Sequence, residues 1–247
     1  MQKERVAASG EYSVEDSALG RIVVANDVPA NFAVFYTTID FDGRLTGGIA
    51  RELTHFIHGR FGIAASLNTC TQVHGKSVAR AHHAERWREC DSCDALVTNE
   101  RHVALGIKVA DCLPIAMIDP VHDVMANIHS GWRGTVQRIT AATLDELLQT
   151  TAFDPSEAHA YLGPSIRQCC FEVGEEVASQ FNDAYVDRSG AKPHVDLAEF
   201  TAEVLRERGF STDRIHDSRL CTRCEGSIFH SFRRDGKGGR NLALAAH

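Results

Sequence analysis

The chain has 247 residues, of which 43% are hydrophobic and 24% are charged, and this suits a globular protein with a sizeable core. Its formal net charge of −7 argues against a general nucleic-acid binder, because phosphate contact needs a basic face. No apolar run approaches the length of a membrane span, and the N-terminus lacks the apolar segment of a secretion signal. We therefore expect a cytoplasmic monomer or small homo-oligomer without nucleic-acid or membrane partners. Residues 1–20 are polar, and we expect them to form a loosely held tail.

Strand and helix patterns alternate along the rest of the chain, without a repeat or a break in composition. Short apolar, β-branched runs predict strands over 31–38, 66–71, 93–98, 103–109, 113–118, 124–128, 158–162 and 214–217. Amphipathic spacing predicts helices over 49–60, 134–150, 174–182 and 196–208, the last capped by Asp196 and ended by Gly209. This mixture predicts an α/β (α+β layered) fold in which residues 21–247 form a single domain of mixed β-sheets flanked by helices.

Three chemically useful side chains follow predicted strands. Cys112 lies between the runs 103–109 and 113–118, and His129 comes directly after the run 124–128. A thiol and an imidazole at strand ends can face one pocket, and His74, which precedes Gly75, could supply a third metal ligand. Cys112 with His129 could instead be a nucleophile–base pair. A metal site is favoured because a dyad does not need a second histidine.

The chain contains eight cysteines, and two pairs have CxxC spacing. Cys90 with Cys93 and Cys221 with Cys224 could together form a four-thiolate structural zinc site. More than half of the chain separates the two pairs, so we favour ordinary reduced thiols.

An ordered set of short motifs covers about residues 70–240. They are QVHG at 72–75, DALVT at 94–98, ADCLP at 110–114, HSGWRG at 129–134, GPSI at 163–166, CFEVG at 170–174 and SFRRDG at 231–236. Together they are far more specific than any one of them. This set resembles the laccase-domain family, also called multicopper polyphenol oxidoreductases and more recently purine nucleoside phosphorylases.

The resemblance implies a fold similar to the cysteine-hydrolase fold of the bacterial cytotoxic necrotizing factor. It also implies a catalytic zinc site formed by His74, Cys112 and His129. The implied enzyme uses phosphate to split adenosine, inosine, guanosine and methylthioadenosine, and it deaminates adenosine in a second reaction. Two alternatives from the same family are a copper-dependent polyphenol oxidase and an editing hydrolase for peptidoglycan precursors that would use Cys112 and His129. Copper is a possible metal, but the absence of paired HxH motifs favours zinc.

Phosphorolysis needs a cradle for a doubly charged anion, and arginine suits that role. Arg133, beside His129 at a predicted helix start, is the best candidate for binding phosphate, followed by Arg233 and Arg234. Gln72 is a further candidate for binding substrate. Each arginine could instead pair with a carboxylate such as Asp235. Relatives usually carry an early Thr-Arg-x-Gly-Gly motif, but the matching residues 36–43 contain no arginine. This leaves open a non-catalytic member that acts as a binding protein.

Overall fold

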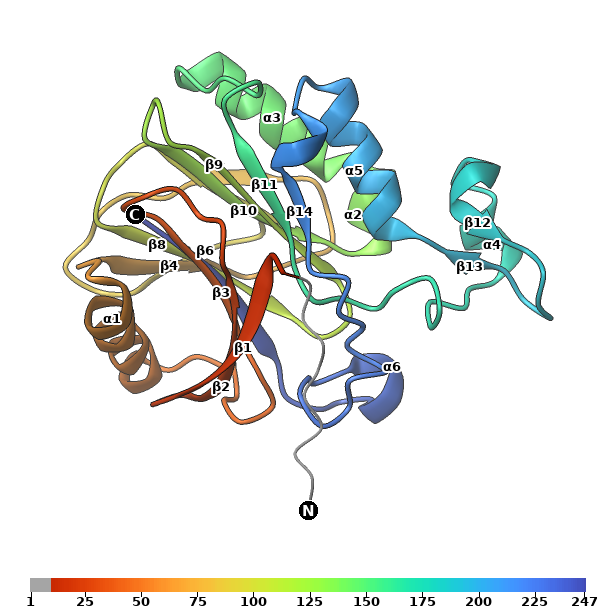
Figure 1. The fold of residues 1–247 in the computed structure, drawn as a ribbon, viewed down its shortest axis with the longest axis horizontal. Coiled ribbons are helices and arrows are strands. Elements are labelled where there is room, and N and C mark those ends of the chain that lie inside the picture. The colour runs from red at the N-terminus through yellow and green to blue at the C-terminus, as the bar shows by residue number, and fades with distance from the viewer. Residues whose placement is uncertain (1–9) are drawn as a thin grey trace.

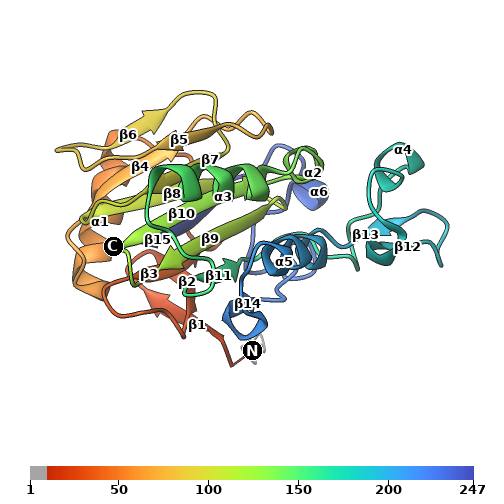
Figure 2. The same cartoon turned by 90° about the horizontal axis from the view of Figure 1, so that it is seen from above.

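A computed structural model describes residues 10–247. Two large sheets lie face to face, and helices cover both outer faces (Figures 1 and 2). The seven-stranded sheet contains, in spatial order, β1 (Tyr12–Ser17), β2 (Gly20–Ala25), β3 (Ala33–Thr37), β15 (Asn241–Ala246), β8 (Val103–Val109), β4 (Ser66–Cys70) and β6 (Arg88–Cys90). The six-stranded sheet contains β14 (Ile215–Asp217), β11 (His159–Leu162), β9 (Leu113–Asp119), β10 (Val124–Ser130), β7 (Ala95–Thr98) and β5 (Val78–Arg80).

Three longer helices cover the sheets, and the remaining elements are short. The longer helices are α1 (Gly47–Phe61), α3 (Ile139–Thr150) and α5 (Leu197–Glu207). The shorter elements are α2 (Trp132–Val136), α4 (Glu175–Ala178), α6 (Phe232–Asp235), the 3-10 turns at Asp183–Tyr185 and Thr212–Arg214, and a ribbon of β12 (Val186–Asp187) with β13 (His194–Val195). The mixed α/β single domain that the sequence predicts is confirmed. No helix within residues 10–247 is long and apolar enough to cross a membrane.

The layers follow from the alternation of side chains along each strand. In β8, Leu105 and Ile107 pack between the two sheets, whereas Ala104 packs on the other face with the residues of α1. In β9, Ile115 and Met117 pack on the face that α3 and α5 cover. Because both faces of these strands are buried, their sequences are continuously apolar, and the predicted strands there are confirmed.

Side-chain caps begin two of the longer helices, and that of α5 is predicted from the sequence. Thr46 caps α1 by accepting a hydrogen bond from the backbone N–H of Ile49, and Gly62 ends the helix with a φ of 73°. Asp196 caps α5 by accepting from the backbone N–H groups of Ala198 and Glu199.

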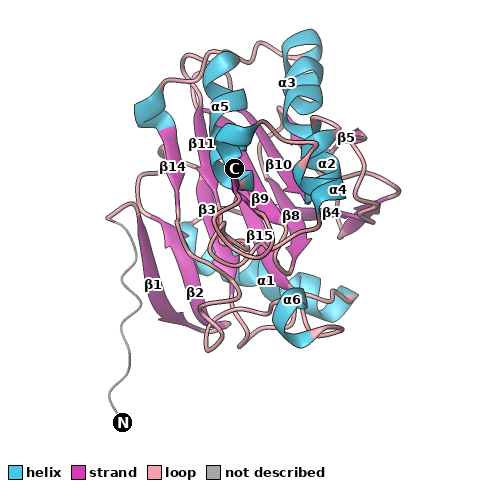
Figure 3. Ribbon diagram, turned by 90° about the vertical axis from the view of Figure 1, so that its right-hand side faces the viewer, coloured by secondary structure: helices cyan, strands magenta, loops and turns pink. Residues whose placement is uncertain are grey.

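Three predicted boundaries are wrong. The helix expected over 134–150 is divided into α2 and α3, because Arg138 adopts the left-handed conformation with a φ of 63°. The helix expected over 174–182 is only the single turn of α4. Part of the expected tail over 1–20 is ordered as β1, which pairs with β2 at the edge of the seven-stranded sheet (Figure 3), while residues 1–9 lie outside the described residues.

Candidate metal centre

Strand pairing brings the three predicted ligands together at one end of the two sheets. β9 and β10 are antiparallel, and His129 pairs with Pro114, so that Cys112 at the entry to β9 lies beside His129. β4 and β8 are parallel in the other sheet, so the segments that leave them, which carry His74 and Cys112, emerge at the same end.

The three side chains form a compact set of possible metal ligands. One ligand atom from each of His74, Cys112 and His129 lies within 4.8 Å of the others. The Cys112 Sγ is 4.0 Å from the His74 Nε2, and the rings of His74 and His129 are nearly perpendicular, with centroids 4.7 Å apart. His129 is buried, Cys112 is half-buried and His74 is exposed, so one side of the set is open to solvent.

Gly131 provides the space that this arrangement needs. A Cβ at Gly131 would lie 2.9 Å from the Cys112 Sγ and 3.2 Å from the His74 Cδ2, closer than normal contacts allow. The glycine of HSGWRG is therefore required by close approach of the ligands rather than by its backbone conformation.

Asp94 organises the site, and the sequence interpretation gave it no role. Its Oδ1 accepts hydrogen bonds from the His129 Nδ1 at 2.8 Å and from the backbone N–H of His74 at 2.9 Å. Its Oδ2 accepts from the backbone N–H of Gly75 at 2.7 Å. Since Nδ1 carries the proton in the first contact, the Nε2 of His129 is left free to bind a metal. The backbone bonds also hold His74 at a φ of 60°, in the left-handed region that disfavours non-glycine residues.

Neighbouring charges shift the pKa values of Cys112, His129 and Asp94. Desolvation by itself raises the pKa of the Cys112 thiol, but the hydrogen bonds and charges of His129 and His74 lower that pKa to about 6. Desolvation by itself lowers the pKa of the His129 imidazole, but the hydrogen bonds and charges of Asp94 and Cys112 outweigh it and raise that pKa to about 9. Burial raises the pKa of Asp94, but the hydrogen bonds from His129 and Gly75 outweigh it and lower that pKa. The site therefore favours a thiolate, which is the form that binds metal.

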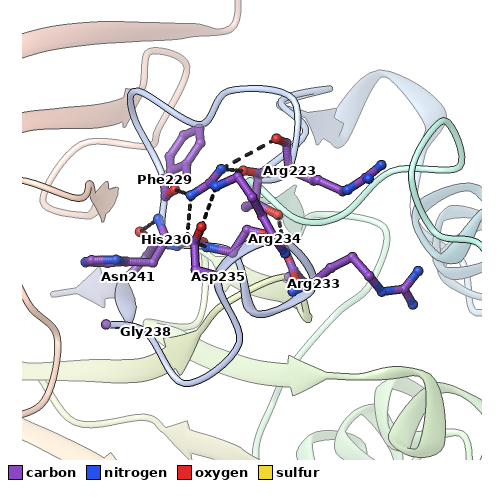
Figure 4. A network of polar contacts seen from close by, with 12 residues as sticks. Arg223, Phe229, His230, Arg233, Arg234, Asp235, Gly238 and Asn241 are labelled. Atoms are coloured by element: carbon purple, nitrogen blue, oxygen red, sulfur yellow. Dashed lines mark hydrogen bonds and ion pairs between the residues drawn. The ribbon is translucent and has the colours of Figure 1, made fainter.

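Two of the predicted phosphate-binding arginines belong to segments next to the predicted ligands. Arg133 is exposed, and its guanidinium stacks 4.4 Å over the Trp132 ring, two residues from Gly131. Arg233 is also exposed, and its backbone N–H donates to the Oδ2 of Asp111, the residue before Cys112, at 2.7 Å. The Arg233 guanidinium donates to a backbone carbonyl, and Figure 4 shows this side chain extending away from its neighbour Arg234.

The other two candidates make structural contacts. The Arg234 guanidinium forms an ion pair with Asp235 at 2.6 Å and donates to the Phe229 carbonyl at 2.7 Å (Figure 4). The Gln72 side chain bonds both to the carbonyl and to the N–H of Lys108 in β8, at 2.7 and 2.9 Å. Arg234 thus pairs with Asp235, the carboxylate that the sequence analysis names as an alternative partner. Gln72 connects the His74 loop to the sheet.

The two CxxC pairs do not meet, so the hypothesis that they form one four-thiolate site is wrong. Cys93 is buried in the same core cluster as Cys70 instead. Cys221 and Cys224 gather with Cys169 and Cys170.

The chain belongs to the family described as multi-copper polyphenol oxidoreductase laccase, whose model matches residues 50–247. It is 40% identical over 154 residues to an adenosine deaminase, RL5, from an unknown prokaryotic organism, with 59% of this chain and 58% of that protein covered. It is 32% identical to the purine nucleoside phosphorylase YlmD of Bacillus subtilis, with 69% of this chain and 62% of that protein covered. The chain thus spans about six tenths of the length of these two curated relatives.

Two further similarities cover more of the chain. A purine nucleoside phosphorylase of Bacteroides thetaiotaomicron is 31% identical over 229 residues, which are 86% of this chain and 84% of that protein. The crystal structure of YlmD from Geobacillus stearothermophilus shares the fold, with a TM-score of 0.81, 24% identity and coverage of 95% of this chain and 98% of that one. The similarity to the cytotoxic necrotizing factor remains a prediction.

Proposed function

We propose that this chain is a zinc-dependent purine nucleoside phosphorylase that also deaminates adenosine. Its substrates would be adenosine, inosine, guanosine and methylthioadenosine, which phosphate converts to the free base and ribose-1-phosphate. The observation that carries the proposal is the convergence of His74, Cys112 and His129 at one solvent-open point, with Asp94 orienting the buried imidazole. The names of the relatives, purine nucleoside phosphorylase and adenosine deaminase, support the same reaction classes.

The donor set fits zinc. Two imidazoles and a thiolate are good zinc ligands, and three protein ligands leave a fourth position for water or substrate. When bound, zinc supplies Lewis acidity, which polarises a group placed beside it. Among residues 10–247, the only other group of potential ligands contains four cysteines and no histidine. A multicopper centre would need further clustered histidines, so we assign zinc rather than copper.

The residues around the metal position have separate tasks. Asp94 holds the His129 ring and the His74 loop, so that little reorganisation is needed when a ligand binds. Arg133 follows His129 by four residues, and the backbone of Arg233 is bonded to Asp111, the residue before Cys112, so two exposed arginines from different segments are available near the site. Guanidinium groups bind phosphate in a bidentate way. We propose that these two arginines supply the phosphate site in place of the arginine that residues 36–43 lack.

The test is phosphate-dependent release of purine base from adenosine and inosine, measured together with bound zinc. Cys112→Ala should lose both activity and the zinc of this site, whereas Cys90→Ala, a half-buried cysteine outside the ligand groups, should retain both. Base release that does not depend on phosphate would contradict the phosphorylase assignment. Zinc binding without turnover of any purine nucleoside would support the non-catalytic alternative.

A cysteine hydrolase is the second candidate, and one observation favours it. His129 lies between Asp94 and Cys112, and the lowered pKa of Cys112 beside the raised pKa of His129 is the pattern of a thiolate–imidazolium pair. The substrate would then be a wrongly loaded peptidoglycan precursor. Chelation distinguishes the candidates, because a metal-free hydrolase would retain activity that Cys112→Ala abolishes.

A further inference from the structure

Four cysteine sulfurs gather in a second cluster that the proposed reaction does not use. Cys169 and Cys170 lie in the turn beyond β11, and Cys221 and Cys224 lie in the loop before α6. One sulfur from each lies within 4.8 Å of the others, and the Cys224 Sγ is 3.4 Å from that of Cys170 and 3.8 Å from that of Cys169. The two loops are also joined by backbone hydrogen bonds, including the Thr222 N–H to the Ser165 carbonyl at 3.0 Å.

These separations match a tetrahedral zinc site. A Zn–S bond of about 2.3 Å places the sulfurs of a tetrahedral Zn(Cys)₄ site about 3.8 Å apart. The two separations of Cys224 from Cys170 and Cys169, 3.4 and 3.8 Å, are close to that spacing. A disulfide would instead need about 2.05 Å between two sulfurs. A closed set of four protein ligands is typical of structural zinc, in contrast to the open three-ligand set at His74.

Hydrogen bonds fix both turns that carry the cluster. The Arg234 guanidinium donates to the Thr222 carbonyl at 3.2 Å, and the Glu225 N–H donates to the Cys221 carbonyl at 2.9 Å. In the other turn, the Cys170 N–H donates to the Arg167 carbonyl at 2.8 Å. The fold itself therefore holds the four sulfurs together, so that a metal ion would meet its ligands already in place.

We propose that Cys169, Cys170, Cys221 and Cys224 bind a second, structural zinc ion. Thr222, which lies between two of these ligands, indicates what this zinc ion would stabilise. The Thr222 hydroxyl donates to the buried Oδ1 of Asp111 at 2.6 Å, and Asp111 directly precedes Cys112. The zinc ion thus cross-links two loops and, through Thr222, holds the turn that presents Cys112.

Metal analysis of single variants tests this proposal independently of any enzymatic activity. Wild type should contain about two zinc ions per chain, and Cys112→Ser and Cys224→Ser should each contain about one. Cys90→Ser is the matched control and should contain the same amount as wild type. Because Cys224 is exposed, its substitution should leave the fold intact, which far-UV circular dichroism would verify. In Cys112→Ser, only the second site remains, so zinc-free Cys112→Ser protein would overturn the proposal even if the first site binds metal.

Cobalt provides the second measurement. Cobalt-loaded Cys112→Ser should show the intense sulfur-to-metal charge-transfer bands of a tetrahedral four-thiolate site, and Cys224→Ser in the same background should weaken them. Chelation should also raise the reactivity of these thiols toward a colorimetric thiol reagent. A disulfide among the four cysteines, found by mass spectrometry in protein purified under reducing conditions, would overturn the proposal.

Discussion

Asp94→Asn is the most informative single substitution at the metal centre. The Asp94 side chain is fully buried, and it accepts hydrogen bonds from the His129 Nδ1 and from the backbone N–H groups of Val73, His74 and Gly75 at 2.7–3.3 Å. Asparagine has the same shape, but it has lost the charge and offers one oxygen. If that oxygen stays on the loop, the amide NH₂ faces His129 and favours the tautomer in which Nε2 carries the proton and cannot bind zinc.

The magnitude can be worked from these contacts. Loss of an outer-shell partner typically weakens metal binding about 10- to 100-fold, which is about 1.4–2.8 kcal/mol. Loss of a buried, charge-assisted hydrogen bond also lowers the free energy of unfolding of the metal-free protein by about 1.5–3 kcal/mol. Zinc affinity should be measured by competition with a chromogenic chelator, and stability by denaturant unfolding of the metal-free protein.

Asp119→Asn is the matched control. The Asp119 side chain is also fully buried, and its Oδ2 accepts from the His122 Nδ1 at 2.7 Å and from the Asp154 N–H at 2.8 Å. It lies at the opposite end of β9 from Cys112, so its substitution should cost similar stability and leave zinc affinity unchanged. The reasoning is refuted if Asp94→Asn binds zinc as tightly as wild type, or if both variants lose the same affinity.

Three further predictions concern the same centre. Gly131→Ala should abolish zinc binding at the site of His74, Cys112 and His129 while far-UV circular dichroism stays unchanged, because the new methyl group would overlap Cys112. Gly47→Ala, which has open space around it, should bind zinc as wild type does. Arg133→Ala should raise the KM for phosphate about 10- to 100-fold with little effect on nucleoside binding, and Arg101→Ala should not. In metal-free protein, the lowered pKa means that the Cys112 thiolate forms above about pH 6 and is lost below it. The pH profile of the Cys112 alkylation rate should therefore have its midpoint near pH 6. A midpoint near the usual 9.0 would contradict this.

The central strands and the residues that follow them can be predicted from the sequence, because these strands are buried on both faces. Runs such as 103–109 and 124–128 have few polar residues, so their extent and their ends are clear. Side chains that directly follow such strands are then placed at the end of a sheet. This is why the sequence alone groups His74, Cys112 and His129 as possible ligands of one metal ion.

Other features depend on contacts that local sequence does not encode. β1 has a mostly polar sequence because only one of its edges is paired and much of its surface faces solvent, which makes it resemble a tail. Arg138 breaks the helix without a glycine or proline to mark the position. Asp94 follows a cysteine at a strand entry, and only its folded contacts with His129 and the His74 loop reveal its role.

The turn before Cys112 explains why motifs so far apart in the chain belong to one site. Asp111 has a φ of 87°, a conformation that typically costs about 1–3 kcal/mol for a non-glycine residue. Its carbonyl accepts from the Ile166 N–H at 2.8 Å, and its carboxylate accepts from the Thr222 hydroxyl at 2.6 Å and from the Arg233 N–H at 2.7 Å. Hydrogen bonds from three separate segments therefore hold Asp111 in its strained conformation and fix the position of Cys112. Because Thr222 lies within the cluster of four cysteines, loss of that cluster's metal should weaken zinc binding at the site of Cys112 without abolishing it, since the contacts of Ile166 and Arg233 with Asp111 remain.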